Sequence, residues 1–182
     1  MKIFAETQRF ILRELLQSDL DGMFELESDP EVHKYLGNKT ISDKNQIVEI
    51  IEVVRQQYID NGIGCWAIIE KHTNDFIGWT GLKLIKEKTY GRKNYYDLGY
   101  RILRKYWRQG IATETAFLSL EYAFTQLNIN EVYAGANCEN IASNKILQKV
   151  GMKFIENFYY ENIKCNWYKI EKNNYEINNR NR

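Results

Sequence analysis

The chain has 182 residues, of which 44% are hydrophobic, and this suits a single domain with its own core. It carries 25 Lys and Arg against 24 Asp and Glu, so the net charge of +1 argues against a nucleic-acid-binding protein. Three cysteines without a CxxC pair and only two histidines favour neither a disulfide framework nor a metal site. Without a signal pattern or an apolar run long enough to span a bilayer, the expected compartment is the cytoplasm.

The first part of the chain predicts one strand followed by three helices. Residues 9–15 alternate as a strand, and Ser18-Asp19 caps a helix over residues 20–28. Pro30 suits the first turn of a short second helix. A longer helix begins at Ser42 and ends at Asn61-Gly62.

The rest of the chain predicts six more strands and two helices. Strands are expected at residues 64–71, 76–86, 95–103, 131–136, 152–160 and 163–171, with a hairpin turn at 72–75. The helices are expected at residues 110–127 and 141–150. This order predicts an α/β (α+β) single domain, without the regular alternation of a doubly wound nucleotide fold.

The junction between the strand at 95–103 and the helix at 110–127 carries the main functional signal. It is a basic, glycine-containing loop, Trp107-Arg108-Gln109-Gly110-Ile111-Ala112, at the start of a long helix. The unpaired N–H groups and the positive end of the helix dipole predict a pyrophosphate site. The loop lacks the lysine of a P-loop and the three glycines of a dinucleotide fingerprint.

This loop resembles the acetyl-CoA motif of the GNAT acetyltransferase superfamily, Arg/Gln-x-x-Gly-x-Gly/Ala. Trp107 at the first position resembles the sequences of the ribosomal-protein N-acetyltransferase-like branch, which often have Trp-Gly-Lys-Gly there. Arg108 therefore occupies a position where this branch usually has glycine. The Asn-x-x-Asn-x-x-Ser pattern at residues 137–143, followed by Gly151, also matches this branch. With residues 7–13 and 77–82, the resemblance spans about residues 7–170.

The resemblance implies a GNAT-like domain at residues 1–172 and a flexible tail at 173–182. Its fold is a mixed central sheet of six to seven strands flanked by helices, with two strands splayed at the acetyl-CoA site. The implied activity is the transfer of an acetyl group from acetyl-CoA, the cosubstrate, to a primary amine by direct attack in a ternary complex. The acceptor is a small molecule or a peptide, ribosomal-protein N-termini included, and the protein is a monomer or homodimer.

The resemblance also assigns roles to the loop and to the strand before it. The pyrophosphate is held by the amides of Gln109, Gly110, Ile111, Ala112 and Thr113. The adenosine phosphate is assigned to Arg104, Lys105 and Arg108. Backbone groups of Ile102 and Leu103 pair with pantetheine, and one N–H serves as the oxyanion donor. An ordinary buried strand explains their apolar side chains equally well.

Three polar residues complete the expected site. Asn140 binds the pantetheine arm and Ser143 stabilises the departing sulfur, although either residue also suits a helix cap. Asp97 is the leading candidate for the general base, acting through water, with Glu70 as the weaker candidate. An α-amine, with a pKa near 8, needs less help from a base than a lysine side chain, with a pKa near 10.4.

Two further clusters have both a structural and a functional interpretation. Aromatic residues of the β-rich block belong to the core or line the acceptor cleft: Trp66, Trp79, Tyr95, Tyr96 and Tyr100. An acidic group forms a solvated face or attracts a cationic amine: Glu25, Glu27, Asp29 and Glu31. The alternatives to an enzyme are a non-catalytic acyl-CoA sensor and a ribosome- or RNA-associated module that uses residues 83–93.

Overall fold

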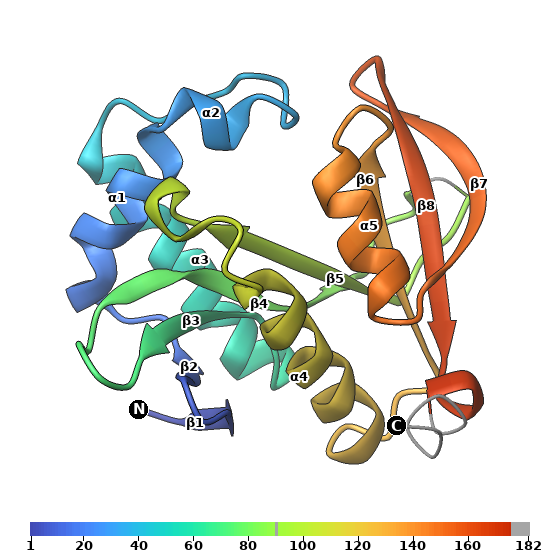
Figure 1. Cartoon of the computed structure of the whole chain (residues 1–182), viewed down its shortest axis with the longest axis horizontal. Helices are drawn as coiled ribbons and strands as arrows, with labels where there is room; N and C mark the ends of the chain where they lie inside the picture. Colours follow the sequence, from blue (N-terminus) through green and yellow to red (C-terminus); the bar gives the residue numbers. More distant parts are fainter. Residues whose placement is uncertain (90, 176–182) are drawn as a thin grey trace.

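The computed structural model describes residues 1–89 and 91–175. Eight strands form one sheet in the order β1-β2-β3-β4-β5-β6-β8-β7 (Figure 1). The strands are β1 Ile3–Glu6, β2 Phe10–Glu14, β3 Cys65–Glu70, β4 Phe76–Ile85, β5 Tyr95–Ile102, β6 Glu131–Asn137, β7 Lys153–Tyr160 and β8 Ile163–Glu171. The helices are α1 Leu20–Ser28, α2 Pro30–His33, α3 Lys44–Asn61, α4 Ile111–Thr125 and α5 Ile141–Lys149, with 3₁₀ turns η1 Gln17–Asp19 and η2 Arg104–Tyr106.

The sheet has one strand more than the six to seven that were expected. The extra strand is β1, which pairs antiparallel with β2 at the edge of the sheet. Four residues are too few for an alternating pattern to stand out from the sequence. The α/β class with a mixed sheet is confirmed, because β5 and β6 pair parallel while the other neighbouring strands pair antiparallel.

Local capping explains where the helices begin and end. The Asp43 side chain accepts a hydrogen bond from the Asn45 N–H, so α3 begins two residues after the expected Ser42. Gly62 ends α3 in the left-handed conformation, with φ of 69°. Helix α1 has the predicted bounds, although the Asp19 side chain makes no cap hydrogen bond and instead pairs with Arg13 at 2.7 Å.

The sheet separates two packed cores. The first is formed with α4 and α5 on one face and includes Leu98, Ile102, Leu120 and Leu147. The second is formed with α1 and α3 on the opposite face and includes Met23, Ile51 and Leu103. Strand β3 contributes to both cores, because successive side chains of a strand point to opposite faces: Trp66 and Ile68 belong to the first, Ala67 and Ile69 to the second.

Strands β5 and β6 splay apart, as expected for this fold. Their register contains a single pair, Asp97 with Tyr133, whereas β6 and β8 pair from Glu131 with Glu171 to Asn137 with Cys165. Beyond Asp97 the two halves of the sheet diverge, and α4 and α5 lie beside each other there (Figure 1). The end of β5 therefore has a sheet neighbour on the β4 side only.

The described structure continues to residue 175, within the tail expected at residues 173–182. Tyr175 is buried, and its ring centroid lies 5.0 Å from that of Phe124 on α4. Of the expected tail, residues 176–182 lie outside the described part of the chain.

Candidate active site

The loop that opens α4 has the backbone shape expected of an anion site. Gly110 is the N-cap residue with φ of 77°, and Arg108 is also left-handed, with φ of 62°. Ile111 is buried and anchors the start of the helix, while Arg108 and Gln109 are exposed. A 15-residue helix places its first N–H groups and the positive end of its dipole at this loop. The residues therefore fit a diphosphate.

Arg9 holds this loop from the other side. Its guanidinium lies 2.5 Å from the Glu114 carboxylate and donates two hydrogen bonds of 3.3 Å to the Gln109 carbonyl oxygen. Glu114 lies in the first turn of α4, so one side chain ties both the loop and the helix to the start of β2. Both segments stand out in the sequence, but no local pattern connects them.

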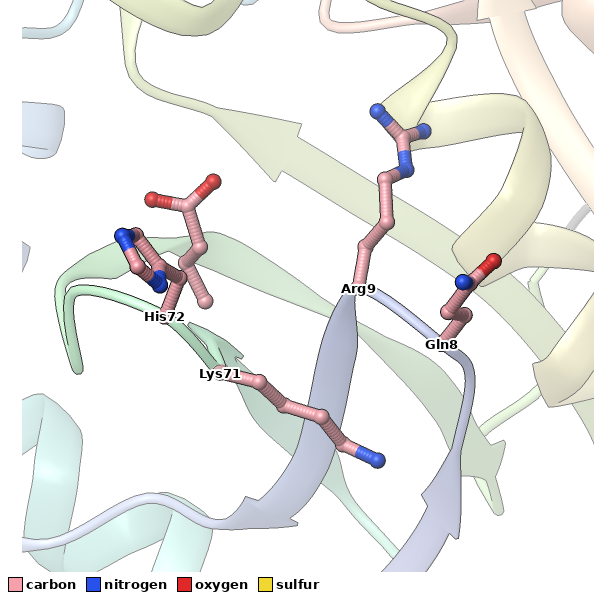
Figure 2. A pocket seen from close by; sticks show the side chains of 5 residues that line it. Gln8, Arg9, Lys71 and His72 are labelled. Carbon is pink, nitrogen blue, oxygen red and sulfur yellow. The ribbon is translucent and has the colours of Figure 1, made fainter.

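An open cavity of about 560 Å³ lies beside Arg9 and is lined by Gln8, Arg9, Glu70, Lys71 and His72 (Figure 2). The Arg9 side chain points away from Lys71 in this view. Lys71 pairs with Glu6 at 2.7 Å, and Glu70 accepts a hydrogen bond from the Thr73 hydroxyl. The Glu70 carboxylate is therefore engaged within the β3–β4 hairpin, and Lys71 links this hairpin to β1.

The backbone at the end of β5 differs from the expectation for Leu103. The Leu103 N–H donates to the Ile77 carbonyl oxygen at 3.0 Å and is therefore engaged with β4. Alternate residues of an antiparallel strand bond to the same neighbour, so the N–H groups of Tyr100 and Ile102 point toward the splay. The Ile102 carbonyl oxygen accepts a 2.7 Å hydrogen bond from the Trp107 indole, which links the strand to the loop.

Asn140 and Ser143 lie in the first turn of α5. The Asn140 side-chain oxygen accepts a hydrogen bond from the Ser143 N–H at 3.1 Å, so Asn140 is the helix cap. Its amide NH₂ makes no hydrogen bond within residues 1–89 and 91–175 and is the group left for a ligand. The Ser143 hydroxyl lies 3.0 Å from the Tyr100 hydroxyl, which reaches it from β5.

Asn144, which the sequence analysis missed, fixes the connection between β6 and α5. Its NH₂ group donates to the carbonyl oxygens of Asn137 and Asn140, at 2.8 and 2.7 Å. Its side-chain oxygen accepts from Asn166 at 2.7 Å and from the Tyr168 hydroxyl at 2.8 Å. Only a buried side-chain amide satisfies two acceptors and two donors in this way.

Asp97 lies where the splay begins. It is half-buried, and burial raises the pKa of its carboxyl to about 7, while the charge of Lys83 acts in the opposite direction. Lys83 lies directly opposite on β4. A carboxyl with this pKa exchanges protons near neutral pH, as a general base requires. Asp97 stands three residues before Tyr100, or about 10 Å along the strand.

The acidic group on α1 and α2 is mostly neutralised by basic partners. Glu25 pairs with Lys105 at 3.0 Å, and Asp29 pairs with Arg104 at 2.9 Å. Two of the three basic residues expected at the adenosine phosphate are therefore engaged elsewhere. Arg108, in contrast, forms no ion pair with the residues that the structure describes.

Glu27 is the centre of a buried network on the same side. Its carboxylate pairs with Arg101, lies 3.0 Å from His33 Nε2, and accepts a 3.3 Å hydrogen bond from the Trp79 indole. Glu27 and His33 are each only 5% exposed. The network joins α1, α2, β4 and β5 and is a structural connection rather than a free acidic surface.

The aromatic residues of the β-rich block divide between those packed in the core and those with polar contacts. Trp66 is fully buried and stacks on Phe4, with ring centroids 4.7 Å apart. Tyr95 packs against Tyr133 and Trp167. Trp79 and Tyr100 instead contact Glu27 and Ser143.

Two other findings concern the described ranges 1–89 and 91–175. No group of three or more side chains there has the arrangement of a metal site. No helix there combines the length and apolar character needed to cross a membrane.

Comparison with known proteins identifies the family. The family described as "Acetyltransferase (GNAT) domain" matches residues 9–153. The chain belongs to the GNAT acetyltransferase family. The N-acetyltransferase p20 of Bacillus licheniformis is 31% identical over 147 residues, covering 81% of this chain and 80% of that protein. This GNAT protein is therefore an acetyltransferase, which argues against the non-catalytic sensor.

Solved structures show the same fold at low sequence identity. The ribosomal L7/L12 α-N-protein acetyltransferase RimL, in complex with coenzyme A, has a TM-score of 0.79 and 13% identity and covers 93% of this chain and 98% of its own. Spermidine N-acetyltransferase from Vibrio cholerae, in complex with CoA and spermine, has a TM-score of 0.75 and 17% identity, covering 93% and 99%.

Proposed function

We propose that this GNAT protein transfers an acetyl group from acetyl-CoA to a primary α-amine of a peptide or small molecule. The observation that carries the proposal is the loop from Arg108 to Ala112, where left-handed Arg108 and Gly110 lead into the N-terminus of α4 next to the splayed strands. The coenzyme A bound to two structural neighbours supports the same cosubstrate here.

In this proposal the chain positions the reactants for direct attack. The amides of residues 109–113 hold the diphosphate, and the Asn140 amide holds the pantetheine arm. The N–H groups of Tyr100 and Ile102 take the place expected of Leu103, because they face the splay. One of them donates to the thioester oxygen as negative charge develops on it.

The transfer forms a C–N bond and breaks the C–S bond. The unprotonated amine attacks the thioester carbonyl, and the sulfur leaves with the bonding pair as a thiolate next to Ser143. The proton of the amine passes through water to Asp97, which is too far along β5 for direct contact.

The paired carboxylates bear on the choice of acceptor. Because Glu25, Glu27 and Asp29 already have basic partners, the site offers little extra attraction to a polycation. RimL and spermidine N-acetyltransferase share the fold equally, so the fold does not choose between their acceptors. The charges favour a singly charged amine such as a peptide N-terminus, which is also easier to deprotonate.

A thiol-release assay with acetyl-CoA and matched amines tests this proposal. At pH 7.5 we expect kcat/KM for a peptide α-amine to exceed that for the same peptide with only a lysine amine by roughly a hundredfold, the ratio of their unprotonated fractions. Spermidine should be a poor acceptor. Efficient turnover of spermidine, or none of any amine, would contradict the proposal.

A further inference from the structure

A contact between the side chain of Tyr100 and Ser143 crosses the splay. The Tyr100 hydroxyl lies 3.0 Å from the Ser143 hydroxyl and 3.2 Å from the Ser143 carbonyl oxygen. Tyr100 belongs to β5 and Ser143 to the first turn of α5, where β5 and β6 no longer pair. This contact therefore joins the two halves of the site at the place proposed for the sulfur.

Two hydrogen-bond arrangements are compatible with these distances. A carbonyl oxygen only accepts, so in the first arrangement Tyr100 donates to the Ser143 carbonyl and the serine hydroxyl donates to Tyr100. In the second, Tyr100 donates to the serine hydroxyl, whose own proton is then free to point elsewhere. Each hydroxyl has one proton, so the two arrangements exclude each other.

We infer that Tyr100 is a positioning residue that acts through Ser143 by changing between these two arrangements. When negative charge appears on the sulfur of departing coenzyme A, the Tyr100 O–H turns from the serine carbonyl to the serine hydroxyl. The serine O–H then donates to the sulfur. No covalent bond of either residue forms or breaks, and the thiolate keeps its electron pair. The inference rests on the proposed function, because it requires the sulfur beside Ser143.

The surroundings suit a donor that keeps its proton. Burial raises the pKa of Tyr100 to about 12, so its hydroxyl stays protonated throughout the working pH range. The Asn140 cap and the Asn144 hydrogen bonds hold the first turn of α5 in place. A chain of two hydroxyls in a partly buried site spreads the negative charge of the sulfur better than one hydroxyl does.

The test measures the pKa of the coenzyme A thiol while it is bound, from the ultraviolet absorbance of the thiolate. We expect the bound thiol in the unmodified protein to have a pKa below its value in free coenzyme A. Ser143→Ala should raise the bound-thiol pKa by about one, the effect of losing one hydrogen bond to a charged group. Tyr100→Phe should raise it by about half as much. The double variant should match Ser143→Ala, since Tyr100 acts only through the serine.

A matched control separates this effect from general damage. Tyr96→Phe removes a hydroxyl from the same strand and the same face, and that hydroxyl makes no contact with Ser143. It should leave the bound-thiol pKa unchanged, and all variants should bind coenzyme A alike at low pH, where the thiol is neutral. If Tyr100→Phe folds poorly, Ser143→Ala still tests the serine donor on which the inference depends.

The outcomes distinguish the inference from the proposed function. Binding by the unmodified protein, with equal thiol pKa values in Tyr100→Phe and Tyr96→Phe, would overturn the inference and leave the proposed function intact. An unchanged pKa in Ser143→Ala would overturn it as well. If the unmodified protein does not bind coenzyme A, the inference and the proposed function are both wrong.

Discussion

Arg108 shows how one residue departs from its family pattern without changing the loop. It occupies a left-handed conformation with φ of 62°, where the family branch that it resembles often has glycine. A residue with a Cβ atom pays roughly 1 kcal/mol for this conformation. The strained residue places an exposed cation beside the proposed phosphate site, and this cation forms no ion pair in the described ranges.

We expect Arg108→Gly to stabilise the fold by about 0.5–1 kcal/mol, because glycine relieves the left-handed strain. Urea unfolding measures the change in the free energy of unfolding. Gln109→Gly is the matched control, since Gln109 is exposed in the same loop but is not left-handed, and it should be neutral or destabilising. A loss of stability in Arg108→Gly would contradict this. It would show that the Arg108 side chain makes a contact whose stabilisation exceeds the strain of its left-handed backbone.

Asp97 carries a prediction about pH. Its pKa in the folded protein is about 7 and the pKa of an α-amine acceptor is near 8, so kcat/KM should rise about a hundredfold per pH unit below pH 7 and about tenfold per unit from pH 7 to pH 8. Asp97→Asn should lower the rate and remove the steeper part of the profile below pH 7. An unchanged pH–rate profile in the variant would exclude Asp97 as the base.

The same carboxyl should make stability depend on pH. Its pKa is near 3.9 in an unfolded chain and about 7 in the folded protein, so the folded state holds the proton more tightly. The Asp97 contribution to stability is therefore present below pH 4 and is lost as the pH rises to 7. Asp97→Asn should gain stability relative to the unmodified protein between pH 5 and pH 8, as urea unfolding would show. If the stability difference between Asp97→Asn and the unmodified protein were the same at pH 5 and at pH 8, this would contradict the raised pKa.

At the scale of elements, α1 and α2 are attached to β4 and β5 by the Glu27 network. A buried carboxylate with a guanidinium, an imidazole and an indole as partners leaves unpaired groups when it is changed. The ion pairs of Glu25 and Asp29 nearby are more exposed and contribute less.

Glu27→Gln should therefore lower the free energy of unfolding by about 2–4 kcal/mol, since it leaves the Arg101 charge without its partner in a buried site. Glu25→Gln, on the same helix and paired with exposed Lys105, should change it by less than about 0.5 kcal/mol. Thermal or urea unfolding of both variants makes the comparison. Equal losses of stability in the two variants would mean that the Glu27 network does not attach α1 and α2 to the sheet.

Arg9 connects β2 to the loop, and this predicts an effect on cosubstrate affinity. Arg9→Gln should weaken coenzyme A binding about tenfold, because the Gln109 carbonyl and Glu114 lose a charged partner. Lys71→Gln, which lines the same cavity but pairs with Glu6, should have no effect on binding. Calorimetric titration measures both, and equal affinities would exclude a role for Arg9 in positioning the loop.

Local patterns in the sequence predicted most elements but not the contacts between distant ones. The bounds of α1 follow from periodicity and the glycine end of α3 from capping, which both act within a few residues. Arg9 and Glu114 are 105 residues apart, and Tyr100 and Ser143 are 43 apart. Their pairing depends on how the fold places α4 beside the start of β2 and α5 beside β5, which no spacing along the chain reveals. The direction of the Leu103 N–H depends likewise on register with β4.

For the whole molecule, the divergence of β5 and β6 allows one sheet to be both scaffold and site. The strands from β1 to β5 form a continuous antiparallel unit, and β6, β8 and β7 form another. A single pair at Asp97 and Tyr133 joins them, and α4 begins where they part. In the proposed function, the helix N-terminus, the unpaired edge of β5 and the first turn of α5 therefore bind the same ligand.

Titration of coenzyme A into the folded protein and into two glycine variants is the most direct test of this account. Gly110 and Gly91 both have φ of 77°, but only Gly110 opens α4, so Gly110→Asp and Gly91→Asp impose the same strain and charge at different places. We predict that the unmodified protein and Gly91→Asp bind with equal affinity and that Gly110→Asp loses binding while remaining folded. Equal binding by Gly110→Asp would contradict the assignment of the diphosphate to the start of α4.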